Sequence, residues 1–358
     1  MITGHGGNIH EVAKMLGCAP ADIMDMSSNV NPMGPMPGLL RHLENHLQEA
    51  ISALPQADAS HCVNAFANCY QLDSKCVLAA NGTTQFIYTI PKALNTKKAL
   101  VLAPTYSDYA DACAMHDVAC DFFVTKPSAG FIPEMEKFKA AIKTADTIFI
   151  CNPNNPTSVL LSKKHLLELC HSFPAKRFVI DESYLPFVEQ AKKQSMMDSG
   201  LDNVLVLNSM SKIFRIPGLR IGFIVAAEKI IDRFRHYLMP WSVNSLAQQA
   251  IFYLMTHKVD VDQFIDASRK FLSAEKDFIA GHLADTPGVR LFPSATSFIL
   301  AELTAPHSAV SICDQVLKDR ILLRNCANFK GLNQNFIRIS IKTHRENTAV
   351  VSRLQQVL

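Results

Sequence analysis

Short apolar runs alternate with helix-like segments through the middle of the chain. The segments Thr84–Leu94, Tyr106–His116 and Ser162–Ser172 carry apolar residues at helical spacing. The apolar runs around them are predicted strands: Cys76–Ala80, Ala99–Ala103, Thr147–Cys151, Phe178–Ile180, Val204–Asn208 and Ile221–Val225. Strands that are apolar throughout are typical of a parallel sheet with helices on both faces. The pattern therefore predicts an α/β fold with a mostly parallel sheet.

The pattern changes after Trp241. Two long helices are predicted, followed by short strands and helices, which indicates a smaller α+β domain. The elements are helices Ser242–Met255 and Val259–Leu283, strand Ser297–Leu303, a helix near Val310–Lys318, strand Asn335–Ile341 and a terminal helix. Near the N-terminus, the turn-rich stretch Asn29–Gly34 is expected to cross between domains. We expect an N-terminal segment at 1–40, a large domain at 41–245 and a small domain at 246–358.

Composition narrows the class of protein. The 358 residues are 48% hydrophobic and 19% charged, which indicates a globular chain. The net charge of +3 is too small to suggest nucleic acid as the main partner. Ten cysteines without a C-x-x-C pair indicate reduced thiols, and no metal site is expected. No run is long enough to span a membrane and the N-terminus lacks a signal-peptide pattern, so a cytoplasmic protein is expected.

A lysine at the end of an apolar run carries the most specific chemistry. Lys212 follows the run Val204–Asn208, lies next to the hydroxyls of Ser209 and Ser211, and precedes Arg220. A primary amine can form a Schiff base with an aldehyde, while hydroxyls and a guanidinium can hold a phosphate. This combination predicts pyridoxal 5'-phosphate as the cofactor.

Other loops after predicted strands supply partners for the cofactor ring. Asp181 follows the run Phe178–Ile180 and could keep the pyridine nitrogen protonated. Glu182 is the competing choice, because neighbours in a strand point to opposite faces. Asn155 and Tyr184 are candidate donors to the ring oxygen. Taken singly, each has an ordinary structural alternative. Asp181 could cap a turn, Asn155 could belong to a rigid turn, and Tyr184 could be a half-buried aromatic.

The cofactor phosphate and the face of the ring also have candidates. Gly82, Thr83 and Thr84 begin a helix after a strand, where backbone N–H groups bind anions. Alone, this sequence would indicate only a helix start. Tyr106 could stack on the ring or be an ordinary core aromatic.

Four of these motifs together resemble the class I/II aminotransferase family of fold type I pyridoxal phosphate enzymes. They are Asn152–Thr157, Asp181–Tyr184, Ser209–Lys212 and Pro217–Arg220. The resemblance implies a large domain with a mostly parallel seven-stranded sheet between helices, a smaller α+β domain, and a homodimer with its active site at the interface. It also implies that Lys212 is catalytic and moves protons, and that Arg338 binds a substrate carboxylate.

Two activities within the family fit the chain. Thr3–Ile9, Met239–Asn244 and Arg324–Phe329 resemble the branch that decarboxylates O-phosphorylated amino acids, such as L-threonine O-3-phosphate in cobalamin biosynthesis, or O-phosphoserine. The alternative is transamination of histidinol phosphate or a similar amine. A third hypothesis is a regulator that binds its ligand without turnover, but no DNA-binding segment is visible in the sequence.

By the same resemblance, four residues of this chain lie at or near the substrate phosphate: His5, Gly6, Asn29 and Arg324. For His5 the alternative is a disordered terminal residue, although the adjacent glycines could form a backbone anion nest.

The chain also departs from the family pattern at three places. Ser158 replaces the usual glycine after Asn-Pro-Thr, and Thr83–Gln85 lacks the acidic residues often found there. Leu54–Gln56 replaces a Tyr-Pro-Asp motif that lends a phenol from the partner subunit to the cofactor phosphate. Either another donor serves this phosphate, or its binding cup is looser.

Overall fold

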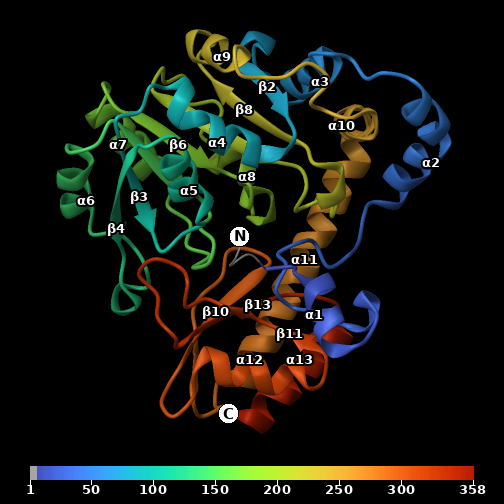
Figure 1. The fold of residues 1–358 in the computed structure, drawn as a ribbon, viewed down its shortest axis with the longest axis vertical. Coiled ribbons are helices and arrows are strands. Elements are labelled where there is room, and N and C mark those ends of the chain that lie inside the picture. Colours follow the sequence, from blue (N-terminus) through green and yellow to red (C-terminus); the bar gives the residue numbers. More distant parts are fainter. Residues whose placement is uncertain (1–5) are drawn as a thin grey trace.

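The computed structural model describes residues 6–358, and its large domain is built on one seven-stranded sheet (Figure 1). The strand order is β2-β8-β7-β6-β5-β3-β4. Six strands run in the same direction, and β8 runs antiparallel to them. The strands are β2 (Val77–Ala80), β3 (Lys98–Ala103), β4 (Ala119–Val124), β5 (Thr147–Cys151), β6 (Arg177–Asp181), β7 (Val204–Ser209) and β8 (Gly222–Ala226). The predicted mostly parallel sheet is therefore confirmed.

Helices cover both faces of this sheet, because its central strands are buried on both sides. One face packs against α4 (Gly82–Ala93), α5 (Asp108–Met115) and α9 (Glu228–Arg235). The other face packs against α3 (Ser60–Tyr70), α6 (Met135–Ile142), α7 (Lys163–Ser172) and α10 (Ser245–Thr256). Such two-sided burial explains why β5, β7 and β8 read as continuous apolar runs.

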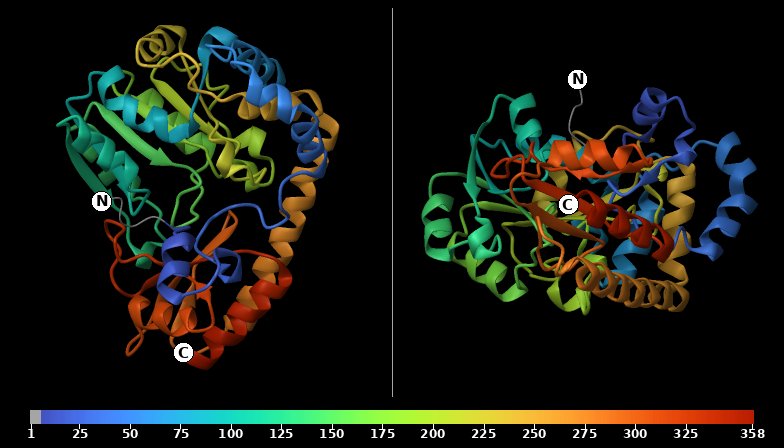
Figure 2. Two further views of the ribbon diagram at one scale, coloured as in Figure 1. Left: turned by 45° about the vertical axis from the view of Figure 1, so that its right-hand side comes forward. Right: turned by 90° about the horizontal axis from the view of Figure 1, so that it is seen from below.

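The small domain has a four-stranded antiparallel sheet in the order β12-β13-β10-β9. Its strands are β9 (Val289–Leu291), β10 (Phe298–Leu303), β12 (Arg324–Asn325) and β13 (Phe336–Ser340), and its helices are α12 (Ala309–Leu317) and α13 (His344–Val357). The long helix α11 (Lys258–Leu283) runs from α10 beside the large domain down to α13 (Figure 1). This helix links the two domains along one side of the molecule (Figure 2).

The N-terminal segment is attached to the small domain. Helix α1 (Ile9–Leu16) packs Val12 and Ala13 against Leu317 and Leu322, and β1 (Met24–Asp25) pairs in parallel with β11 (Ile321–Leu322). The chain then passes to α2 (Pro37–Ser52), which lies at the edge of the molecule beside α10 (Figure 1). The exact domain boundaries stay predictions.

The remaining elements are short. Helix α8 spans Ala191–Gln194, and 3-10 helices lie at Pro20–Asp22, Ser74–Cys76, Pro127–Ala129, Leu185–Phe187 and Pro217–Leu219. Within residues 6–358, no helix combines the length and apolar character needed to cross a membrane.

Two sequence expectations need correction. The helix expected at Tyr106–His116 begins only at Asp108, so Tyr106 lies in the preceding loop. The pattern also gave no sign of β4, an edge strand in which exposed and half-buried residues interleave. An edge strand covered on one side lacks the apolar run that marks the central strands.

Candidate active site

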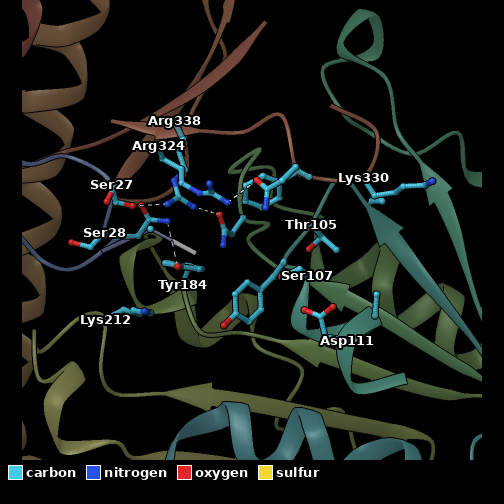
Figure 3. A pocket seen from close by; sticks show the side chains of 18 of the residues that line it. Ser27, Ser28, Thr105, Ser107, Asp111, Tyr184, Lys212, Arg324, Lys330 and Arg338 are labelled. Atoms are coloured by element: carbon cyan, nitrogen blue, oxygen red, sulfur yellow. Dashed lines mark hydrogen bonds between the residues drawn. The ribbon is translucent and has the colours of Figure 1, made fainter. Parts of the chain in front are cut away.

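Two adjoining cavities lie between the carboxyl ends of the parallel strands and the small domain. We call them the inner cavity, which lies toward the sheet, and the outer cavity, which lies toward the small domain. Figure 3 shows the outer cavity. Four residues line both: Tyr106, Asn155, Tyr184 and Lys212. Every cofactor-binding residue predicted from the sequence lines the inner cavity: Gly82, Thr83, Thr84, Tyr106, Asn155, Asp181, Tyr184, Ser209, Ser211 and Arg220.

One end of the inner cavity is built for an anion. The first turn of α4, at Gly82 and Thr83, presents unpaired helix N–H groups, and Ser209 ends β7 nearby. Gly82 has φ 77°, and a Cβ there would lie 2.8 Å from Nη2 of Arg220. Only glycine allows this close approach of backbone and guanidinium. The donors suit a phosphate group.

Asp181, which also lines the inner cavity, is held in place by two donors. The hydroxyl of Tyr109 donates to its Oδ2 at 2.7 Å, and the backbone N–H of Ser183 donates to its Oδ1 at 2.9 Å. Tyr109 was not predicted, because an aromatic residue in an amphipathic helix is indistinguishable from ordinary core.

Glu182, the competing choice, faces away from both cavities. Its Oε2 accepts from Oγ of Ser195 at 2.6 Å and its Oε1 accepts from the N–H of Met196 at 2.6 Å. Burial raises the pKa of this carboxyl to about 7. Strand alternation has thus placed Asp181 at the cavity and Glu182 in the core.

The turn that carries Asn155 is fixed by side-chain amides. Asn152 bonds both ways with the backbone of Leu161, at 2.9 Å and 2.7 Å, and Asn154 donates to the carbonyl of Pro104 at 2.7 Å.

Ser158, which replaces the usual glycine, adopts φ 60°. Its hydroxyl bonds with that of Thr296 at 2.7 Å, which ties this turn to the small domain. Ser158 thus adopts a left-handed backbone conformation that favours glycine, and its side chain makes a hydrogen bond that glycine could not make.

Lys212 follows β7 at the junction of the two cavities. Burial lowers the pKa of its ammonium to about 8, and the positive charges of Arg220 and Arg338 act in the same direction. A lysine with this pKa carries a useful fraction of neutral, nucleophilic amine near neutral pH.

Two aromatic residues complete the wall around Lys212. Tyr106 lies edge-on to Tyr109, with ring centroids 5.9 Å apart. The hydroxyl of Tyr184 accepts from the side-chain amide of Asn29 at 3.4 Å, and burial raises the pKa of Tyr184 to about 12. Tyr184 therefore stays a neutral donor across the physiological pH range.

The outer cavity contains two arginines that face each other. Arg324 and Arg338 are direct partners across the β12–β13 pair, and both line the cavity (Figure 3). Burial lowers the pKa of each guanidinium, and the positive charge of Arg338 lowers the pKa of Arg324 further. Like charges directly opposite each other are unfavourable in a sheet. A bound anion would relieve this repulsion.

The predicted substrate residues divide as follows. Gly6, Asn29, Arg324 and Arg338 line the outer cavity, and His5 lies outside the described residues. Leu54 lines neither cavity and is 80% exposed, so this chain offers no phenol at that place. The outer cavity also includes Ser27 and Ser28, which the sequence did not single out.

The lysine, the carboxylate and the start of α4 stand at the carboxyl ends of β7, β6 and β2, and the donor set fits a phosphorylated pyridine aldehyde. The fold is that of the fold type I pyridoxal phosphate enzymes. Residues 21–354 match the family model described as aminotransferase class I and II, and the chain belongs to this family. The resemblance seen in the sequence is confirmed. Members of the family use pyridoxal 5'-phosphate, and fold type I enzymes are typically homodimers with active sites at the interface.

Similar proteins include decarboxylases and aminotransferases. Threonine-phosphate decarboxylase of Salmonella typhimurium is 30% identical over 99% of this chain and 97% of its own length. The crystal structure of L-threonine-O-3-phosphate decarboxylase from Porphyromonas gingivalis superposes with a TM-score of 0.82 at 29% identity, covering 93% of this chain and 99% of that one. The histidinol-phosphate aminotransferase structure from Clostridium acetobutylicum gives 0.84 at 25% identity, covering 94% and 99%. An adenosylcobalamin biosynthesis bifunctional protein of Leptospira interrogans is 29% identical over 99% of this chain, which spans 41% of that protein.

Proposed function

We propose that the chain binds pyridoxal 5'-phosphate in the inner cavity and decarboxylates an O-phosphorylated amino acid held in the outer cavity. The observation that carries this proposal is the pair Arg324 and Arg338, which lie in one cavity with Lys212. A substrate with a carboxylate and a phosphate engages both guanidiniums at once. Histidinol phosphate has a phosphate but no carboxylate, so it leaves one of them without an anion.

The inner-cavity residues divide the cofactor between them. The N–H groups of Gly82–Thr84, with Ser209, Ser211 and Arg220, hold the phosphate. Asp181, oriented by Tyr109, keeps the pyridine nitrogen protonated. When bound, the cofactor supplies a ring that accepts the electron pair released as a bond to the substrate α-carbon breaks.

Tyr106, Asn155 and Tyr184 line the same cavity, where Tyr106 would stack on the cofactor ring and Asn155 and Tyr184 would donate to its oxygen. Lys212 binds the cofactor aldehyde and carries a proton to or from the substrate α-carbon.

The outer-cavity residues orient the substrate. Arg338 holds the carboxylate, and Arg324, with Gly6 and Asn29, holds the phosphate. These anchors decide which bond at the α-carbon stands perpendicular to the cofactor ring and therefore which bond breaks.

The proposed reaction converts L-threonine O-3-phosphate to (R)-1-aminopropan-2-yl phosphate, or O-phospho-L-serine to ethanolamine phosphate. Either amine would serve as the linker of a cobamide nucleotide loop. The similarity to threonine-phosphate decarboxylases at 29–30% identity supports this choice. The two substrates differ by one methyl group, which is worth only about 1–3 kcal/mol of discrimination.

The second candidate function is a histidinol-phosphate-type aminotransferase. The superposition on such an enzyme at a TM-score of 0.84 favours it. Both reactions would use Lys212, Asp181 and the phosphate-binding residues in the same way.

We also propose that the protein is a homodimer. Leu40, Leu47 and Ile51 are exposed on α2, and Leu54 follows them. Exposed Trp241 lies beside this loop, since its N–H donates to the carbonyl of Ala57 at 2.8 Å. An apolar surface of this kind fits a second copy of the chain. An active monomer in analytical ultracentrifugation would contradict this proposal.

One experiment separates the two reactions. The purified protein, loaded with cofactor, is incubated with O-phosphothreonine, with O-phosphoserine, or with histidinol phosphate plus 2-oxoglutarate, and carbon dioxide and glutamate are measured. Carbon dioxide without glutamate supports the decarboxylase. Glutamate without carbon dioxide refutes it. In Lys212→Ala, the visible absorption band of the bound cofactor should disappear, and an unchanged band would show that Lys212 does not bind the aldehyde.

A further inference from the structure

Strand β13 and the residues after it present a row of polar side chains on one face. Arg338, Ser340 and Lys342 are 4%, 0% and 5% exposed, and they alternate with Ile339 and Ile341, which belong to the main apolar core. Alternation in an extended chain puts the three polar side chains on the same side. Burying the ammonium of Lys342 costs free energy unless the group is well hydrogen-bonded, so its partners are of interest.

These three side chains each contact one residue of the segment Ser27–Asn29, which lines the outer cavity. Nη2 of Arg338 donates to the carbonyl of Ser27 at 2.6 Å. Nζ of Lys342 donates to the carbonyl of Ser28 at 2.9 Å. The hydroxyl of Ser340 donates to Oδ1 of Asn29 at 2.6 Å. Successive residues of the segment are therefore fixed by alternate residues of β13 and its extension.

Asp25 holds the same segment through its serine side chains and backbone. Its Oδ1 accepts from the hydroxyl of Ser27 at 2.6 Å and from the backbone N–H of Ser27 at 2.9 Å, and its Oδ2 accepts from the hydroxyl of Ser28. The hydroxyl of Ser27 in turn accepts from the N–H of Gly7 at 2.8 Å. Ser28 is thus held at two points: its carbonyl accepts from Lys342 and its hydroxyl donates to Asp25.

The orientation of Arg338 depends on this arrangement. Its Nη1 donates to the side chain of Asn155. Its Nη2 donates to the carbonyl of Ser27 (Figure 3). Its Nε is buried and has no hydrogen-bond partner within residues 6–358. A guanidinium has five N–H groups, so enough remain for a bidentate bond to a carboxylate. The hydrogen bond to the Ser27 carbonyl sets the direction in which the remaining N–H groups of Arg338 point.

We propose that Asp25 and Lys342 are positioning residues for the substrate carboxylate: by fixing Ser27 and Ser28, they set the orientation of Arg338. This inference rests on the proposed function, in which Arg338 binds that carboxylate. Neither residue lines the outer cavity, so each acts through the segment and not through the substrate. A small displacement of such an anchor is enough to weaken both binding and reaction geometry.

The test compares two ligands that differ by the carboxylate alone: O-phosphothreonine and 1-aminopropan-2-yl phosphate. Cofactor-loaded wild type, Lys342→Met and Asp25→Asn are studied, with Lys318→Met as the control, because Lys318 is exposed on the same domain. The KM for the amino acid is measured by carbon dioxide release. The Kd of the amine is measured from the change that it causes in the cofactor absorption band.

We expect Lys342→Met and Asp25→Asn to raise the KM of the amino acid about tenfold or more, and the Kd of the amine less than about twofold. Lys318→Met should change neither. Equal losses for both ligands, or no loss, in the two variants would overturn the inference. Should Lys342→Met fail to fold in a thermal melt, Asp25→Asn carries the same comparison.

Arg338→Met separates this inference from the proposed function. If it weakens only the amino acid while the positioning variants do not, the role of Asp25 and Lys342 is wrong and that of Arg338 stands. If it weakens both ligands equally, Arg338 does not bind the carboxylate, and the inference fails with it.

Discussion

Replacing Glu182 with glutamine should remove a pH-dependent penalty from folding and leave cofactor binding intact. The carboxyl of Glu182 is buried behind β6, and its pKa is raised to about 7 by burial. A glutamine has the same shape and remains neutral at every pH. Its Oε1 can accept from the N–H of Met196 and its Nε2 can donate to the hydroxyl of Ser195, which replaces both observed bonds.

The sign and size of the effect follow from the two pKa values. The folded-state pKa of about 7 lies above the ordinary value of 4.5, so the folded protein holds this proton more tightly than the unfolded chain. The associated stability is complete below about pH 4.5 and is lost as pH rises through 7. An interval of about 2.5 between the two values corresponds to roughly 3 kcal/mol. As pH rises through this range, the unfolding free energy of the wild type should fall by roughly this amount relative to that of Glu182→Gln.

The assay is urea unfolding of the cofactor-free protein at about pH 5 and about pH 8. The quantity compared is the change in unfolding free energy between the two pH values, variant against wild type, so that other titrating groups cancel. Glu189→Gln is the matched control, because Glu189 is exposed and only seven residues away. An identical pH dependence in wild type and Glu182→Gln would refute the reasoning. The variant should also retain the cofactor, which Asp181→Asn should bind more weakly.

Two further predictions concern the inner cavity. With a pKa of about 8 in place of the ordinary 10.5, Lys212 is roughly 300-fold richer in neutral amine at pH 7. The rate of cofactor uptake, followed by the visible band, should rise about tenfold per pH unit and level off near pH 8; a rise continuing beyond pH 10 would contradict it. Tyr109→Phe removes a 2.7 Å hydrogen bond to Asp181. It should weaken cofactor binding about tenfold or more in equilibrium dialysis, and an unchanged Kd would exclude an orienting role.

The inner cavity was predictable because its chemistry follows buried strands. β5, β6 and β7 each have a buried apolar centre, so the polar residues at or just after their carboxyl ends stand out in the sequence. Parallel strands bring their carboxyl ends to one edge of the sheet, which gathers Asn155, Asp181 and Lys212. The choice between Asp181 and Glu182 was a question of phase along a strand, and the structure was needed to answer it.

The outer cavity was less predictable because it joins distant parts of the chain. Ser28 and Lys342 are hydrogen-bonded although they are 314 residues apart. Asp25 sits in a two-residue strand whose partner is β11, and such a short element leaves no periodic signal. The alternation of Arg338, Ser340 and Lys342 was visible in the sequence, but nothing in the sequence says which segment that face covers.

Asn155 is the residue through which the two cavities are coupled. Arg338 has only hydrogen-bond donors, so the Asn155 atom that faces it must be the amide oxygen. Asn155 lines both cavities, so its amide nitrogen is the atom that the proposed hydrogen bond to the cofactor ring oxygen would use. Any rotation of Arg338 away from Ser27 would remove the contact that fixes this amide. One side chain, Asn155, therefore ties the proposed carboxylate anchor Arg338 to the proposed cofactor site, and the placement of Ser27–Asn29 bears on both.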